Sequence, residues 1–150
     1  MPVRCEIVTQ DKLLFEGMVD SIVAPGTEGE LGILPHHAPL LTTLDFGVLR
    51  VRIEGREEAF VIAGGVMEVL PQSVSVLADV GENVAEIDIA RAEKAKARAE
   101  ALLKSRPKMD EDEYRALEAA LRRSNLRLGA ARRYHRTARR PLGMNTGEGE

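Results

Sequence analysis

The residues of this chain best suited to chemistry are arginines, which gather in an acid-free stretch near the C-terminal end. The segment from Ala119 to Gly147 contains eight arginines and no acidic residue. A guanidinium group stays protonated at any ordinary pH and offers a planar fork of N–H donors that fits carboxylates and phosphates. We therefore expect this segment to contact an anionic partner.

Charge divides the chain into two unlike halves. Residues 1–86 hold five Lys or Arg against fourteen Asp or Glu, a net charge of −9. Residues 87–150 hold sixteen against ten, a net charge of +6, so the overall charge of −3 conceals the difference. Such asymmetry predicts two modules that face different partners.

Other kinds of chemistry find little support in the sequence. His36 and His37 are adjacent, and neighbours on an extended chain point to opposite faces, so we predict no metal site. The glycines from Gly26 to Gly32 precede no helical pattern, which argues against a phosphate-cradling loop. No serine or cysteine stands in a nucleophile-elbow context, so we expect no catalytic residue and no enzymatic activity. The single cysteine, Cys5, is expected to be buried in the first strand.

The first half of the chain has the pattern of a β-domain. Apolar residues occupy every second position at Val3, Cys5 and Ile7, and the same period of two recurs at 49–54. Turn residues separate several short strands, and Gly64-Gly65 is expected to break the strand run at 59–70. This pattern predicts an antiparallel sandwich or barrel.

The segment from Pro25 to Pro39 differs from its surroundings. Its glycines and prolines leave little room for regular structure, yet Leu31, Ile33 and Leu34 are large and apolar. A Gly- and Pro-rich loop that carries such residues is typical of a contact surface.

The second half predicts two helices. Asp88 is a suitable N-cap for an alanine-rich helix at 89–104, which Pro107 terminates. Asp110 caps a second helix, with Glu113 three residues later. Facing stripes, of alanines on the first helix and of Tyr114 and leucines on the second, predict a closely packed antiparallel hairpin. Alanine buries little area, so the two helices are held together weakly. High helix propensity keeps each of them helical when they separate, so we expect this hairpin to open without melting.

Several segments together resemble the epsilon subunit of rotary proton-translocating (F-type) ATP synthases. They are Gly26–Thr42, which reads GTEGELGILPHHAPLLT, Ala63–Val69, which reads AGGVMEV, and the strand Val74–Ala78. The similarity covers roughly residues 2–138, and the order of a β-domain followed by two helices matches as well. The resemblance implies an α+β protein of two domains, a ten-stranded N-terminal β-sandwich followed by a C-terminal antiparallel α-helical hairpin. We place the sandwich at 1–86, the hairpin at 87–140 and a disordered tail at 141–150.

The resemblance also implies partners and a location. A subunit of this family lies in the central stalk, bound to the gamma subunit and resting on the c-subunit ring, below the alpha and beta catalytic subunits. It has no catalytic residues and reaches the cytoplasmic face of the cell membrane only through the complex. The expected contacts with gamma and the c ring are Glu30, Leu31, Ile33, Leu34, His36 and His37.

A nucleotide site is implied in the same way. ATP-binding bacterial members carry an Ile/Leu-Asp-x-x-Arg-Ala motif, which stands here as Ile87-Asp88-Ile89-Ala90-Arg91-Ala92. Matching the family's pattern along both helices gives a regulatory ATP site of Glu82, Asp88, Arg91, Arg98, Arg123 and Arg127. The spacing is compatible, because residues four or seven apart share a helix face. The alternative is that Asp88 is only a cap and that the arginines lie on solvated faces.

The arginine-rich end is expected to act on the catalytic head. The resemblance implies that, in an open hairpin, the second helix would meet the acidic C-terminal segment of the catalytic beta subunits and inhibit ATP hydrolysis. The expected contacts are Arg122, Arg132, Arg133, Arg136, Arg139 and Arg140. A generic basic terminus is the alternative, and a nucleic-acid-binding adaptor is the rival function. That adaptor would need aromatic residues near the charge, and Tyr134 is the only candidate after Tyr114.

Overall fold

The computed structural model describes residues 1–105 and 108–138, with side chains as far as Tyr134. Eight strands are followed by a short 3-10 helix and two α-helices in this part of the chain. The elements are β1 (Val3–Val8), β2 (Leu13–Val19), β3 (Ser21–Gly26), β4 (Gly29–Ile33), β5 (Leu40–Ile53), β6 (Arg56–Leu70), β7 (Ser73–Ala78), β8 (Gly81–Asn83), η1 (Val84–Glu86), α1 (Ile89–Ser105) and α2 (Glu111–Ala138).

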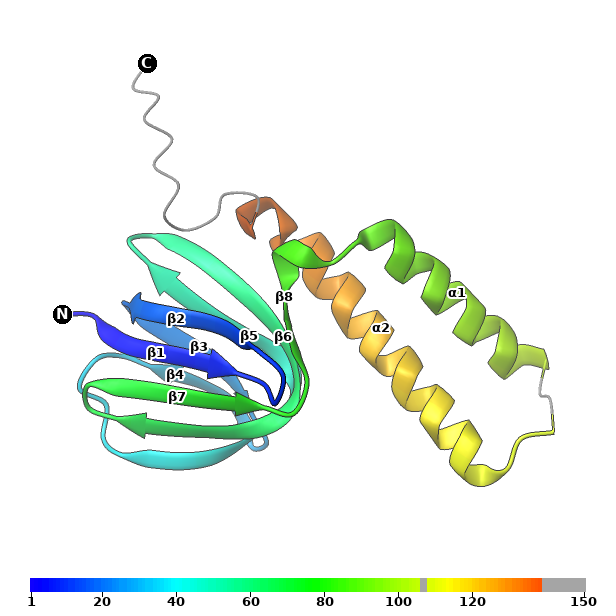
Figure 1. The fold of residues 1–150 in the computed structure, drawn as a ribbon, viewed down its shortest axis with the longest axis horizontal. Helices are drawn as coiled ribbons and strands as arrows, with labels where there is room; N and C mark the ends of the chain where they lie inside the picture. Colours follow the sequence, from blue (N-terminus) through cyan, green and yellow to red (C-terminus); the bar gives the residue numbers. More distant parts are fainter. Residues whose placement is uncertain (106–107, 139–150) are drawn as a thin grey trace, which may run out of the picture.

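The strands form a β-sandwich, as the sequence predicts. Hydrogen bonds join them in the order β2-β1-β7-β6-β5-β3-β4, with β8 added to β6. Every pair is antiparallel except β1 with β7, which is parallel. Figure 1 shows the strands curving around a common interior, while the two helices extend to one side. The ten strands implied by the resemblance compare with eight described here, of which β5 and β6 are the longest at 14 and 15 residues.

The interior of the sandwich is built from alternate residues of most strands. Ile7, Ile22, Leu49, Phe60 and Val76 are all fully buried in one apolar cluster. No side chain of this cluster comes from α1 or α2. The sandwich therefore has a core of its own.

Strand β6 does not end at Gly64-Gly65, contrary to the sequence-based expectation. The strand runs through both glycines, which have φ of 81° and 141°. On one side of them β6 pairs with β8, and on the other side it pairs with β7. Positive φ is available to glycine without steric cost, so the pair lets one strand change partner without a break.

The segment from Pro25 to Pro39 is also more regular than its composition indicates. Strands β3 and β4 form a hairpin there, with Gly26 paired to Gly29. Gly29 has φ of 129°, so this glycine supplies the turn rather than an irregular loop.

The helices begin where the sequence predicts. The carboxylate of Asp88 accepts from the Arg91 backbone N–H at 3.1 Å, and that of Asp110 accepts from the Glu113 N–H at 2.7 Å. The hairpin is closed, as Figure 1 shows. Where α1 ends and α2 begins, the apolar side chains are only half buried, since Leu102 and Tyr114 are 48% and 46% exposed. No helix in the described residues is both long and apolar enough to cross a membrane.

Candidate functional site

A cleft of about 470 Å³ opens at the foot of the helical hairpin, where α1 leaves the sandwich. It brings together four of the six residues predicted to bind ATP. Its walls are Glu86, Asp88, Arg91, Ala92, Ala95, Arg98 and Arg127. Ala92 of the motif and Ala95 of the next turn have short side chains that leave room in the cleft, and Ala92 is 2% exposed. Glu86 was not predicted, although it stands only two residues before Asp88 in the sequence.

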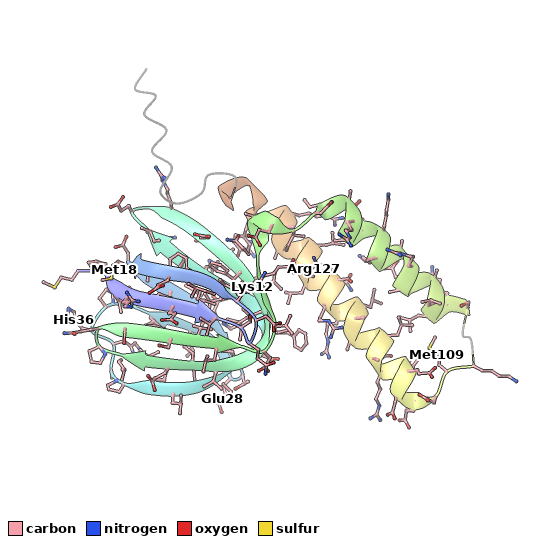
Figure 2. The ribbon with its side chains drawn as sticks, viewed as in Figure 1. Lys12, Met18, Glu28, His36, Met109 and Arg127 are labelled. Carbon is pink, nitrogen blue, oxygen red and sulfur yellow. The ribbon has the colours of Figure 1, made fainter. Side chains whose placement is uncertain are left out.

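The fifth predicted residue, Glu82, is held at the edge of this cleft by Arg127. Its two carboxylate oxygens accept from Nε and Nη2 of Arg127 at 2.5 and 2.9 Å. Figure 2 shows Arg127 on the part of α2 that lies beside the sandwich. The hydrogen bond from Glu82 raises the pKa of the Arg127 guanidinium, and this effect exceeds the opposing effect of burial. A bidentate pair of this kind fixes both side chains in direction as well as in charge.

Arg123 does not belong to the cleft. It is exposed and is absent from the walls. Arg132 of α2 donates to Glu93 of α1 at 2.9 Å, which fixes the register of the two antiparallel helices. Moving five residues along each helix from this pair brings Arg98 level with Arg127. Arg123 then lies one turn farther toward the tip of the hairpin, and its side chain does not line the cleft.

Beside the segment that leads into α1, Glu58 carries a carboxyl group whose pKa is raised. Glu58 of β6 accepts a hydrogen bond at 2.7 Å from the Asn83 amide, which also caps η1 through the Ala85 N–H. Burial raises the pKa of Glu58, the Asn83 bond lowers it, and the nearby charge of Glu86 raises it further. This pair joins the sandwich to the segment that leads into α1.

The C-terminal half of α2 packs on the sandwich through a second apolar cluster. Leu128 and Ala131 are 2% and 0% exposed and contact Val61 of β6 and Val84 of η1, with Ala92 of α1 in the same cluster. The apolar stripe of α2 therefore serves two surfaces, the alanines of α1 and the side of the sandwich.

The residues predicted to contact gamma and the c ring are placed in different environments. Ile33 is 1% exposed and belongs to the sandwich core, so it cannot present a contact surface. Leu31 packs against the same core, and of the three apolar members of this set only Leu34, at 65%, is widely exposed. The alternation of β4 explains this, because successive side chains of a strand point to opposite faces. The prediction that Ile33 is a surface residue was wrong.

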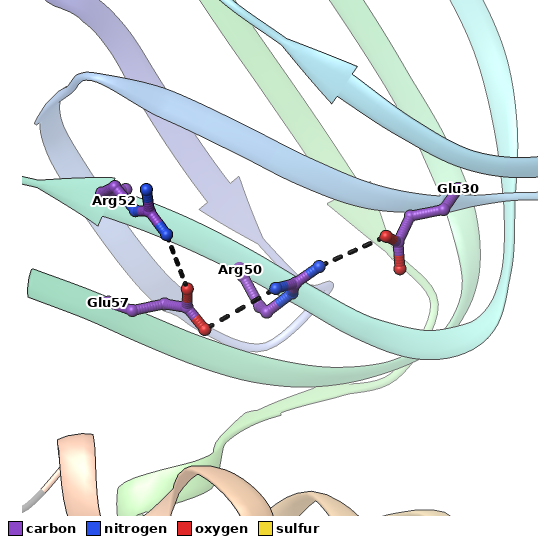
Figure 3. A network of polar contacts seen from close by, with 4 residues as sticks. All are labelled: Glu30, Arg50, Arg52 and Glu57. Carbon is purple, nitrogen blue, oxygen red and sulfur yellow. Dashed lines mark hydrogen bonds and ion pairs between the residues drawn. The ribbon is translucent and has the colours of Figure 1, made fainter.

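Of the other predicted members of this set, Glu30 and His36 are exposed and His37 is half-buried. Glu30 pairs with Arg50 at 3.3 Å in a network that also includes Glu57 and Arg52 (Figure 3). His36 is exposed with φ of 64°, and Nδ1 of His37 lies 2.7 Å from the Ala38 carbonyl oxygen. In the described part of the chain, no three His, Cys, Asp or Glu side chains gather where they could hold a metal ion.

The arginines expected to reach the beta subunits are partly engaged within the molecule. Arg132 pairs with Glu93, the Arg122 guanidinium lies 5.3 Å from the Phe46 ring centroid, and Arg133 lies 5.3 Å from that of Tyr134. The remaining predicted contacts, the Arg136 side chain together with Arg139 and Arg140, lie outside what the structure describes, as does the tail at 141–150.

Comparison with known proteins matches both parts of the chain. The family described as ATP synthase, Delta/Epsilon chain, beta-sandwich domain matches residues 2–84. The family described as ATP synthase, Delta/Epsilon chain, long alpha-helix domain matches residues 85–132. The junction lies within two residues of the boundary expected at 86.

Among full-length relatives, the ATP synthase epsilon chain of Dehalococcoides mccartyi strain BAV1 is 48% identical over 136 residues, covering 88% of this chain and 95% of that one. The epsilon chain of Herpetosiphon aurantiacus is 46% identical and covers 88% and 96%. A chain of the Euglena gracilis mitochondrial ATP synthase (OSCP/F1/c-ring) aligns with a TM-score of 0.62 at 26% identity, covering 85% and 75%. A chain of the Tetrahymena thermophila central stalk and c ring shares the fold, with a TM-score of 0.58 at 18% identity, covering 87% and 97%.

Proposed function

This chain belongs to the delta/epsilon-chain family of ATP synthases, and on that premise we propose that it is a non-catalytic subunit of the central stalk. The sandwich docks on the gamma subunit and the c-subunit ring, so that proton-driven rotation is coupled to ATP synthesis. The helical hairpin regulates ATP hydrolysis by the alpha and beta subunits. The chain lies at the cytoplasmic face of the cell membrane as a peripheral component, held there only by the complex. The nucleic-acid adaptor finds no support among its relatives.

The observation that carries the regulatory part is the cleft at the foot of the hairpin. Arg91 and Arg98 line it, and neither forms an ion pair with any carboxylate of the described residues. Unpaired guanidinium groups facing a common space suit a polyphosphate. A volume of about 470 Å³ also falls in the range of small-molecule sites. We infer that the regulatory ligand is ATP, with Glu82 and Asp88 on the adenine or ribose side.

Such a ligand would stabilise the closed hairpin. The cleft draws its walls from both helices, so opening the hairpin separates Arg127 from Arg91 and Arg98. A ligand shifts a conformational equilibrium only by its preference for one state. ATP bound between the helices therefore favours the closed form, and its loss releases α2.

Calorimetric titration of the purified chain with ATP, with and without magnesium, tests this site. We expect Arg91→Ala and Arg98→Ala each to weaken binding by at least ~1.5 kcal/mol, the lower end for a charge-assisted hydrogen bond. Arg123→Ala is the matched control, because this arginine lies one turn outside the cleft and should leave affinity unchanged. The absence of ATP binding, or equal affinity in all four proteins, would remove the nucleotide from the proposal.

The inhibitory role requires a separate experiment on the assembled enzyme. Replacing Arg132, Arg133, Arg136, Arg139 and Arg140 by alanine should raise ATP hydrolysis at low salt and leave assembly intact. Added salt should raise hydrolysis by the wild type toward the variant level, because the Debye length falls below ~10 Å above 0.1 M. If hydrolysis by the variant equals that of the wild type at low salt, the arginines are not an inhibitory arm.

A further inference from the structure

A second groove, of about 460 Å³, lies on the opposite side of α2 from the nucleotide cleft. Its helical wall includes Asn125 and Gly129, which stand two residues before and two residues after Arg127. Two residues turn an α-helix by about 200°, so these positions face away from the cleft. The facing wall is the sandwich, with the apolar Pro25, Gly47 and Val48 and the charged Glu30 and Arg50 lining the space. The groove is therefore a separate site between α2 and the β-domain.

Small residues keep this groove open. A Cβ added at Gly129 would meet no heavy atom within 4 Å apart from its own helix, so no side chain of the described residues fills the space beside it. Ala130 continues the same low surface. On the sandwich, Gly47 lies tightly against Pro25, where an added Cβ would stand 2.5 Å from the proline ring. The closely packed Gly47 and Pro25 therefore form an apolar part of the groove wall, opposite the open space beside Gly129.

One end of the groove carries a cation without an acidic partner. No carboxylate of the described residues lies within ion-pair distance of Arg133. Its guanidinium stacks instead on the ring of Tyr134, 5.3 Å from the centroid. Arg50 approaches the same ring at 6.0 Å, but Glu30 and Glu57 neutralise it (Figure 3). Arg133 thus supplies the charge that remains available to a ligand.

We propose that this groove binds a small organic anion with a flat apolar body. Its acid group pairs with Arg133, and its body lies over Gly129 and beside the ring of Tyr134. The groove combines apolar surface with polar side chains, and polar groups that fix the orientation of an apolar body are usual in small-molecule sites. Both walls are needed, so the ligand binds only while α2 is docked on the sandwich and favours that state. This second input does not depend on nucleotide binding at the hairpin.

The test uses 1-anilinonaphthalene-8-sulfonate, a fluorescent probe with a flat apolar body and one anionic group. Titration of the full chain should give a saturable enhancement with one probe per chain. Gly129→Leu fills the channel and should raise the dissociation constant at least tenfold, and Arg133→Gln should do the same by removing the charge. Gly129→Leu should not lower the melting temperature, because leucine favours a helix over glycine and meets open space.

Arg132→Gln is the matched control. It removes the same charge one residue away, from an exposed pair with Glu93 outside the groove, and should leave probe affinity within twofold. Arg98→Gln, in the nucleotide cleft, should also leave probe affinity unchanged, which distinguishes binding in this groove from binding in the nucleotide cleft. Failure of the wild type to bind the probe, or equal affinity in the wild type and both groove variants, would overturn the proposal.

Discussion

At the scale of single residues, Cys5 shows how burial controls reactivity. Its side chain is fully buried in the sandwich core. Burial, aided by the charge of Glu6, raises the pKa of the thiol to about 12. Since the thiolate is the reactive form, we expect no reaction of the native protein with a disulfide reagent such as Ellman's at pH 8. One thiol per chain should react in denaturant, and rapid labelling of the native protein would contradict the structure.

Glu58 predicts a pH dependence of stability. Its pKa is raised in the folded state above the ordinary value of 4.5, chiefly by burial. The folded protein then holds this proton more tightly than the unfolded chain does. The resulting stability is fully present below pH 4.5 and is lost as the pH rises through the folded pKa. Glu58→Gln keeps a neutral acceptor for Asn83, so it should be more stable than wild type at pH 7 and equal to it below pH 4.5.

The control for Glu58 lies on the same strand. Glu68 is exposed on β6, so Glu68→Gln should leave the dependence of stability on pH close to that of the wild type. Urea unfolding at several pH values measures all three proteins. If Glu58→Gln and Glu68→Gln give the same profile, Glu58 does not titrate as the structure indicates.

Which residues of the site were predictable follows from the range of their interactions. Asp88, Arg91 and Arg98 lie within a few turns of one helix, so motif and spacing located them. The pairing of Glu82 with Arg127 joins residues 45 apart in the sequence and depends on how α2 docks. No helical or strand period contains that information, which is why both residues were predicted as ligands but not as partners of each other.

At the scale of elements, Gly65 is required for the change of partner within β6. A Cβ added there would lie 2.3 Å from the Leu77 carbonyl oxygen, and φ is 141°. We expect Gly65→Ala to destabilise the sandwich by at least ~2 kcal/mol, since β7 must move away from β6. Gly32→Ala on β4 is the control, because its Cβ would meet open space. Denaturant midpoints of the two variants should therefore differ clearly. Similar midpoints would show that glycine is not required where β6 changes partner.

The docking of α2 on the sandwich is measurable through the pair of Glu82 with Arg127. Their side chains are 29% and 34% exposed, so solvent screens the pair only in part. A double-mutant cycle with Glu82→Gln and Arg127→Gln should give a coupling free energy of about 1–2 kcal/mol in urea unfolding. The pair of Glu111 with Arg115, exposed on one turn of α2, provides a comparison and should couple by no more than ~0.5 kcal/mol. A coupling near zero for the first pair would mean that α2 is not held by it.

Helix and strand positions were largely predictable, whereas their burial was not. The caps at Asp88 and Asp110 are local signals, and both helices begin beside them. The stripe of α2 has the predicted period, yet Tyr114 is exposed while Leu128 is buried. Periodicity identifies a face of a helix, but the sandwich decides which part of that face is covered. The hairpin of β3 and β4 was not predicted because its glycines and prolines have low strand propensity. They nevertheless allow two short strands to pair across a turn.

At the scale of the whole molecule, the opposite charges of the two halves are partly matched internally. Arg127 of the basic half pairs with Glu82 of the acidic half. Arg122 contacts the sandwich without a charge partner there, through a cation–π contact with the Phe46 ring. Charge asymmetry alone predicted separate external partners. In the closed hairpin, part of that charge serves to hold α2 against the sandwich, so an external partner of α2 must compete with the protein's own β-domain.

The sandwich should also fold without the hairpin. Its main cluster is drawn entirely from β-strand residues up to Ala78, whereas the second cluster is shared with α1 and α2. A chain ending at Glu86 should keep its β circular dichroism and unfold cooperatively, at a lower temperature because Ala59, Val61 and Val84 lose their cover. If the sandwich is the docking module, this fragment should still co-purify with the gamma subunit. Folding without co-purification would overturn the docking assignment, and failure to fold would show that α2 completes the domain.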